Sequence, residues 1–145
     1  MLVHYFAPFN NAETDYKVKD YQYFDKNGLR LGFYLDTAQW QGLIQNIPKG
    51  DALAIEAHGN HSLLLRSAEK ESWQNKAWIG PHPLWALIHL YVPKHCPIII
   101  QACYSLEFAK FFKAYMGGRA VWGFDDKLYS ERWCGPDKPN GFQQV

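Results

Sequence analysis

The stretch from Pro97 to Gly118, PIIIQACYSLEFAKFFKAYMGG, decides how the rest of the chain is interpreted. It opens with the short apolar run PIIIQA, which is typical of a strand that is covered on both faces. The segment Leu106–Met116 follows, and its apolar residues recur at the spacing of one helical face. The stretch therefore predicts a buried strand, a turn that begins at Cys103, and an amphipathic helix.

Similar elements lie on both sides of this unit. Two further apolar runs predict strands, ALAIEA over Ala52–Ala57 and RAVWGF over Arg119–Phe124. Helices are expected from Asp36 or Thr37 to about Ile47, and from Pro83 or Leu84 to about Tyr91. Alternation of helices and strands predicts an α/β fold, a three-layer sandwich with a mainly parallel sheet flanked by helices.

Two other regions do not follow this alternation. Lys17–Phe24 and Leu29–Leu35 read as strands joined by Asp25-Lys26-Asn27-Gly28, so an N-terminal β-hairpin is predicted. The polar stretch 60–75 is interpreted as a short hairpin through Leu63–Arg66 followed by a loop. No internal repeat or linker divides the 145 residues, so a single domain over 1–145 is expected.

Composition narrows the classes of function. The net charge is +1 without a run of Lys and Arg, which argues against nucleic-acid binding. The longest apolar stretches are too short to span a bilayer, and the N-terminus does not resemble a signal peptide. The three cysteines lack CxxC spacing, so free thiols are expected and no cofactor or metal is predicted. The predicted location is the cytoplasm, or a target cell reached through a secretion system.

Potentially reactive residues follow two of the predicted strands. ALAIEA leads into His58-Gly59, and PIIIQA leads into Cys103. The carboxyl ends of parallel strands share one edge of a sheet, which is where ligands bind in open α/β folds. An imidazole beside a thiol can accept its proton, so we predict Cys103 as nucleophile and His58 as general base. The backbone amides of Gly59 and Cys103, with those of the following helix, are candidates for an oxyanion hole.

These motifs resemble the caspase-like superfamily of cysteine peptidases, in which a strand ending in His-Gly precedes a strand ending in Cys. Gln101-Ala102-Cys103 matches the caspase pattern, and His58 lies 45 positions upstream. The sequence Cys103-Tyr104-Ser105 is similar to the Cys-x-Ser form of metacaspases, legumains and toxin domains. The resemblance covers about residues 50–125 and is nearest to compact caspase-like domains of bacterial polymorphic toxins, through the segments HGN (58–60), Phe108-Ala109 and Val121-Trp122-Gly123.

The resemblance implies a cysteine endopeptidase acting on protein substrates, an effector role and a cognate immunity or inhibitor protein. The substrate-binding residues that we expect are Gln101, Ser105, Trp122, Asp125 and Asp126. Either aspartate can select a basic side chain if the strand over 119–124 neighbours the strand that carries Cys103. The arginines that select Asp in caspases have no counterpart here, so cleavage after Asp is not inferred.

Other interpretations use the same residues. A caspase-like binding module without turnover would keep the fold alone, and a thiol acyltransferase or deamidase would use the same dyad. His61 could join His58 and Cys103 as a zinc ligand, but the Gly-Asn turn between the histidines and the lack of an evident supporting carboxylate disfavour metal. Cys96 precedes Pro97 and is interpreted as structural.

Overall fold

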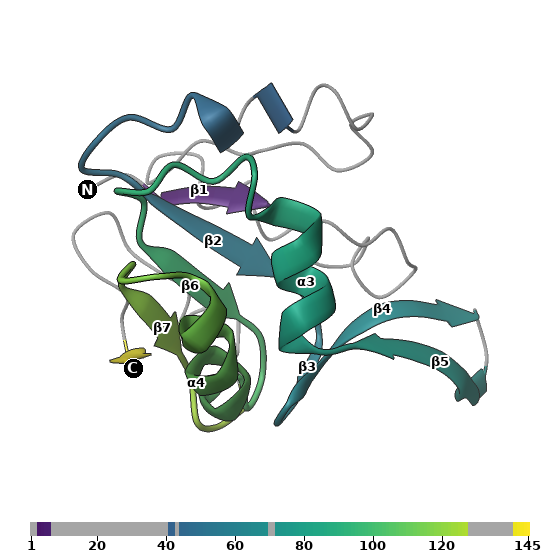
Figure 1. The fold of residues 1–145 in the computed structure, drawn as a ribbon. Helices are drawn as coiled ribbons and strands as arrows, with labels where there is room; N and C mark the ends of the chain where they lie inside the picture. The colour runs from purple at the N-terminus through teal and green to yellow at the C-terminus, as the bar shows by residue number, and fades with distance from the viewer. Residues whose placement is uncertain (1–2, 7–40, 43, 70–71, 128–140) are drawn as a thin grey trace.

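The structure, a computed structural model, describes residues 3–6, 41–42, 44–69, 72–127 and 141–145. These residues form a mixed α/β arrangement with two sheets and two helices among the elements with defined bounds (Figure 1). In chain order these elements are β1 (Val3–Phe6), β2 (Ala52–Glu56), β3 (Gly59–Asn60), β4 (Leu63–Glu69), β5 (Ser72–Ile79), α3 (Pro81–Ile88), β6 (Ile98–Gln101), α4 (Leu106–Tyr115), β7 (Val121–Gly123) and β8 (Gln143–Gln144).

The larger sheet has five strands in the order β1-β2-β6-β7-β8. Strands β1, β2, β6 and β7 run parallel, and β8 pairs antiparallel to β7 at the edge. The predicted mainly parallel sheet is therefore confirmed, and the three apolar runs form its neighbouring strands β2, β6 and β7. Strand β1 was not anticipated, because a strand of four residues at the N-terminus carries no periodic signal of useful length.

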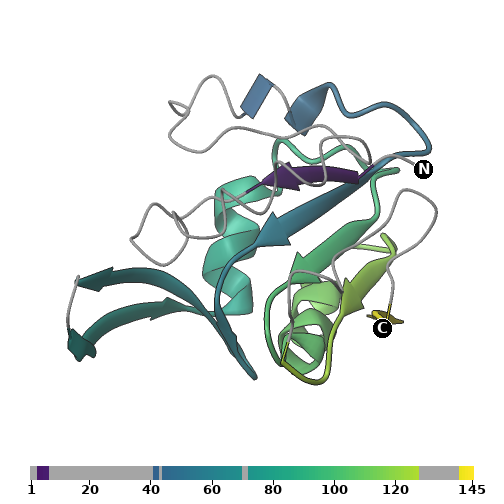
Figure 2. The ribbon, with the colours of Figure 1, turned by 180° about the vertical axis from the view of Figure 1, so that it is seen from behind.

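Helices α3 and α4 cover the same face of the five-stranded sheet (Figure 1 and, from behind, Figure 2). Leu84 and Ile88 from α3 and Phe108 and Phe112 from α4 are buried in one core with the alternate sheet residues Leu53, Ile55, Ile98 and Ile100. Ile44, next to the helical residues 41–42 and itself helical, joins the same core.

The opposite face of the sheet carries a second, smaller cluster. It contains Val3, Ala52, Ala54, Ile99, Phe124 and Phe142, with Cys103 and Trp122 packed against it. Within the described ranges the helices thus form one layer on one face, and the second helical layer of the predicted sandwich is not seen there. The predicted hairpin over 17–35 lies outside the described residues.

The smaller sheet corrects the interpretation of residues 60–75. Strands β3, β4 and β5 form an antiparallel sheet whose β4–β5 hairpin extends away from the larger sheet (Figure 1). The segment from Ser72 to Asn75 was expected to be a loop because its sequence lacks the alternation of a half-buried strand. Pairing with β4 determines its structure instead, through register shifts near Ser67 and Glu69. No helix in the described part of the chain is long and apolar enough to cross a membrane.

Candidate active site

The pairing of β2 with β6 determines the relative position of His58 and Cys103. Glu56 is the partner of Gln101, and the same offset of 45 residues separates His58 from Cys103. Beyond the last pair, the amide of Ala57 still donates to the carbonyl of Gln101 at 3.4 Å. The register therefore ends both strands at the same edge of the sheet, with His58 two residues past β2 and Cys103 two residues past β6, and both residues are partly exposed.

A close approach of the two turns supports the same placement. A Cβ atom on Gly59 would lie 2.3 Å from the Cys103 carbonyl oxygen and 2.8 Å from the Cβ of Ala102. No residue with a side chain fits there without moving one of the two segments. The lack of a side chain at Gly59 therefore makes room for the backbone of the Cys103 turn.

The turn after Cys103 has an unusual backbone. Tyr104 has a φ of 53° and His61 a φ of 48°, and these are the positive-φ residues other than glycine in the described chain. Their rings lie against each other with centroids 4.9 Å apart. Left-handed conformations of such residues are uncommon and concentrate at functional sites, because the surroundings must hold the strain. Here each strained residue follows a predicted catalytic position, by one residue for Cys103 and by three for His58.

Hydrogen bonds hold this turn in place. The amide of Tyr104 donates to the Asp126 carbonyl at 2.9 Å, and the amide of Leu106 donates to the Phe124 carbonyl at 3.0 Å. The first turn of α4 also contacts Gly123 closely, since a Cβ there would lie 2.7 Å from Cα of Leu106. The segment after β7 thus positions the turn that carries the thiol.

Two predicted substrate-binding residues are corrected by their burial. Ser105 is 1% exposed, and its hydroxyl donates to the Ile100 carbonyl at 2.7 Å while accepting from the Phe124 amide at 3.1 Å. It joins β6 to the end of β7 and does not face a substrate. Gln101 is fully buried opposite Glu56, which is also fully buried, so its side chain lies in the interior and not at the rim.

The amides at the start of α4 are a further correction. Tyr104, Leu106 and Phe108 donate their N–H groups to the carbonyls of Asp126, Phe124 and His61 respectively. Donors that are already bonded within the protein cannot stabilise an oxyanion, so these amides are not part of such a site. The amides of Gly59 and Cys103 stay predicted oxyanion donors.

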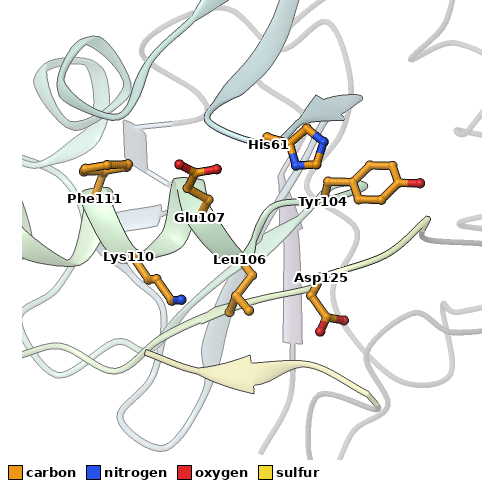
Figure 3. Close-up of a pocket in the computed structure, with 7 residues that line it drawn as sticks. All are labelled: His61, Tyr104, Leu106, Glu107, Lys110, Phe111 and Asp125. Carbon is orange, nitrogen blue, oxygen red and sulfur yellow. The ribbon is translucent and has the colours of Figure 1, made fainter.

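A groove of about 590 Å³ lies beside this edge and wraps around the N-terminal half of α4 (Figure 3). It is lined by His61, Tyr104, Leu106, Glu107, Lys110, Phe111 and Asp125. Asp125 lines this groove, and its role in substrate binding stays a prediction. Asp126 does not line it, and its carboxylate accepts a hydrogen bond from the Lys127 amide instead. Trp122 is partly buried against the cluster on the opposite face of the sheet.

Sequence reasoning missed the part of the groove that α4 contributes. Glu107, Lys110 and Phe111 are spaced as i, i+3 and i+4, so one helical face carries them, and this spacing was an available signal. The Phe111 ring is 56% exposed on that face. Nothing in the sequence indicated Tyr104, because its position depends on the strained turn.

No group of three or more His, Cys, Asp or Glu side chains in the described ranges could hold a metal ion. His61 is exposed and contacts Tyr104, and its carbonyl accepts from the Phe108 amide at 3.2 Å. His61 also lines the groove.

The opposite, amino edge of the sheet contains a different set of polar residues. Cys96 is fully buried, and its thiol donates to the Pro97 carbonyl at 3.4 Å. Burial raises the pKa of the Cys96 thiol to about 11. His4 is buried, with Nε2 2.9 Å from Oδ2 of Asp51. The structural interpretation of Cys96 fits this environment.

Comparison with known proteins adds no family to this description. No protein-family model matches the chain, and a search of curated proteins finds no match.

Proposed function

We propose that this chain is a cysteine endopeptidase that uses His58 and Cys103 as a catalytic dyad, within a caspase-like domain. The observation that carries the proposal is the register of β2 and β6, together with the close contact of Gly59 with the Cys103 turn. Both support an imidazole and a thiol near each other at the carboxyl edge of adjacent parallel strands, where α/β folds bind their ligands.

The reaction follows from the chemistry of the two groups. His58 accepts the proton of the Cys103 thiol, and the thiolate attacks the carbonyl carbon of a peptide bond. The resulting oxyanion accepts hydrogen bonds from the amides of Gly59 and Cys103. His58 then protonates the leaving amine as the C–N bond breaks, which gives a thioester on Cys103. Water attacks the thioester with His58 as base, and the carboxylic acid product leaves with the free thiol restored.

The rigidity of the turn favours a nucleophile over a merely structural cysteine. Cys103 is partly exposed, precedes a residue with positive φ, and is bounded by the hydrogen-bonded residues Tyr104 and Ser105. The strained strand-to-helix turn that carries this thiol is similar to the turns that expose other nucleophiles at the edge of an α/β sheet. A binding module without turnover has no need for that strain beside a thiol.

The test is a comparison of variants on a complex mixture of proteins. Wild type, Cys103→Ala, His58→Ala and the control Cys96→Ala are incubated with a bacterial lysate, and new protein N-termini are identified by mass spectrometry. We expect new termini with wild type and Cys96→Ala, none with Cys103→Ala, and a rate lowered at least about a hundredfold with His58→Ala. Equal termini from Cys103→Ala and wild type would contradict the proposal.

A variation of the same experiment separates hydrolysis from acyl transfer. In isotopically labelled water, an endopeptidase introduces one labelled oxygen at each new carboxyl terminus. A deamidase converts Gln or Asn side chains to acids without new termini. A transglutaminase-like enzyme joins amines to the side-chain carbonyl of Gln. If either of these two products forms with wild type and not with Cys103→Ala, the dyad is catalytic but the reaction is not peptide-bond hydrolysis.

We further propose that the protein acts as a bacterial effector that a cognate inhibitor protein neutralises, as the resemblance to toxin domains implies. Expression of wild type in the cytoplasm of a sensitive bacterium is expected to arrest growth, and expression of Cys103→Ala is not. Growth arrest by both proteins would show that toxicity does not depend on the Cys103 thiol, and this would contradict the proposal of an enzymatic effector.

A further inference from the structure

The rings of His61 and Tyr104 join two turns that lie far apart in the chain. His61 is in the turn between β3 and β4, three residues after His58, and Tyr104 directly follows Cys103. Their ring centroids are 4.9 Å apart at an interplanar angle of 32°, and Figure 3 shows the two side chains beside each other. The proposed reaction uses neither ring, so their contact needs a different explanation.

The backbone at both residues indicates a role for the rings themselves. His61 and Tyr104 have φ values of 48° and 53°, in the left-handed region that glycine adopts without steric cost. Large side chains thus occupy two positions at which a glycine would relieve strain, and these two side chains contact each other. At the other positive-φ positions of the described chain the sequence supplies glycine, namely Gly50, Gly117, Gly118 and Gly141.

Backbone hydrogen bonds anchor both of these residues. The His61 carbonyl accepts from the Phe108 amide of α4 at 3.2 Å, and the Tyr104 amide donates to the Asp126 carbonyl at 2.9 Å. The two rings therefore belong to turns whose backbone is held in place, and their contact fixes the distance between these turns.

A second contact joins the same two turns at another point. Gly59 lies so close to the turn after β6 that a Cβ would be 2.3 Å from the Cys103 carbonyl oxygen. A single contact would leave the turns free to pivot about it, whereas two contacts at separate points also fix their relative orientation. The ring contact and the Gly59 contact together hold the turn that follows His58 against the turn that carries Cys103.

We propose that His61 and Tyr104 are positioning residues, whose ring contact holds the His58 imidazole within reach of the Cys103 thiol. The inference rests on the proposed dyad. Proton transfer between two side chains requires hydrogen-bond distance, so a small separation of the turns lowers the reactivity of the thiol. Loss of either ring should then act through His58, and not on Cys103 alone.

The experiment measures the rate at which iodoacetamide alkylates Cys103 at pH 7, followed by peptide mass spectrometry. Tyr104→Phe keeps the ring, whereas Tyr104→Asn removes it and supplies a residue that tolerates the left-handed conformation. We expect Tyr104→Phe to react within a factor of about two of wild type, and Tyr104→Asn about fivefold more slowly. His58→Ala should react about tenfold more slowly, because the thiol loses its base.

The double variant His58→Ala/Tyr104→Asn separates positioning from a general effect on the turn. If the ring acts by positioning His58, its loss has no further effect once the imidazole is absent, so the double variant should react like His58→Ala. A further fivefold decrease, or a Tyr104→Phe as slow as Tyr104→Asn, would overturn the inference and leave the dyad intact. An unchanged rate in His58→Ala would instead overturn the dyad, and the positioning role with it.

Variants of the partner ring and of the backbone test the same contact. His61→Asn should slow alkylation by the same factor as Tyr104→Asn, and the double variant should be no slower than either, because each substitution removes the same contact. Tyr104→Gly removes the ring and relieves the strain, so it should fold and still react as slowly as Tyr104→Asn. A rate equal to wild type in Tyr104→Gly would overturn the inference.

Tyr115→Asn is the matched control, because Tyr115 is the last residue of α4 and its ring contacts His82 and Trp85. Like Tyr104 it carries a ring packed against a histidine, but it lies at the far end of the helix from the Cys103 turn. Its alkylation rate at Cys103 should stay within a factor of about two of wild type. A decrease as large as that of Tyr104→Asn would contradict a specific role for the His61–Tyr104 contact.

Discussion

The two ends of strand β6 each carry a cysteine, and the two cysteines have opposite environments. Cys96 lies two residues before β6, fully buried at the amino edge, with a thiol whose pKa is raised by burial. Cys103 lies two residues after β6, partly exposed on a strained turn at the carboxyl edge. Parallel strands direct all their carboxyl ends to one edge, so one edge collects turns that can carry chemistry and the other is closed by packing.

The largest expected effect is the difference in reactivity between these two thiols. At about pH 8, some three units below its pKa, only about one Cys96 in a thousand is a thiolate, and burial also denies access. The third cysteine of the sequence, Cys134, is first changed to serine. In this background we expect iodoacetamide to modify Cys103 at least about a thousandfold faster than Cys96, measured by peptide mass spectrometry. In concentrated guanidinium chloride the two rates should converge. Faster modification of Cys96 than of Cys103 in the folded protein would contradict the predicted difference in reactivity between the two thiols.

The next effect concerns the contact between the two turns at the carboxyl edge. Gly59→Ala places a Cβ against the Cys103 carbonyl, so we expect a loss of about 2–3 kcal/mol in the free energy of unfolding. Cys103 alkylation should change as well, because its turn must move. Gly42→Ala is the control, since no atom lies within 4 Å of its Cβ and the residue is helical. A stable Gly59→Ala with unchanged alkylation would contradict the close approach.

Ser105 provides a smaller test of the same edge. Ser105→Ala removes two hydrogen bonds and leaves the buried Phe124 amide without its acceptor, which is expected to cost about 1–3 kcal/mol. Chemical denaturation measures this loss, and kcat on any substrate found should fall as the turn loosens. Full activity at unchanged stability would show that Ser105 does not position the thiol.

The smallest expected effect lies at the amino edge. Asp51→Ala removes the partner of the buried His4, and we expect a loss of about 1 kcal/mol in the free energy of unfolding. The rate of Cys103 alkylation should stay within a factor of about two, because the change lies at the opposite end of β2 and β6. A large decrease in Cys103 reactivity would show that the two edges are coupled.

The sequence was sufficient for the elements that bury a continuous apolar surface. ALAIEA, PIIIQA and the face of Leu106–Met116 are found as β2, β6 and α4, because strong hydrophobic patterning leaves few alternatives. The positions of His58 and Cys103 just after β2 and β6 were predictable for the same reason, and their catalytic role stays a prediction. Part of β4 was predicted as the hairpin through Leu63–Arg66, whereas the strand β5 over Ser72–Ile79 was missed because its first residues carry no such pattern.

The sequence by itself determined that His58 and Cys103 each follow a buried strand, since apolar runs are local properties. The pairing that makes these two strands neighbours came from the tertiary structure. Only the tertiary structure decided that Ser105 and Gln101 are interior, that the amides of α4 are already bonded, and that Glu107 and Asp125 line one groove. These facts depend on contacts between segments distant in the chain, such as the end of β7 with the start of α4. Burial and hydrogen-bond partners are set by such contacts, and no local pattern of residues encodes them.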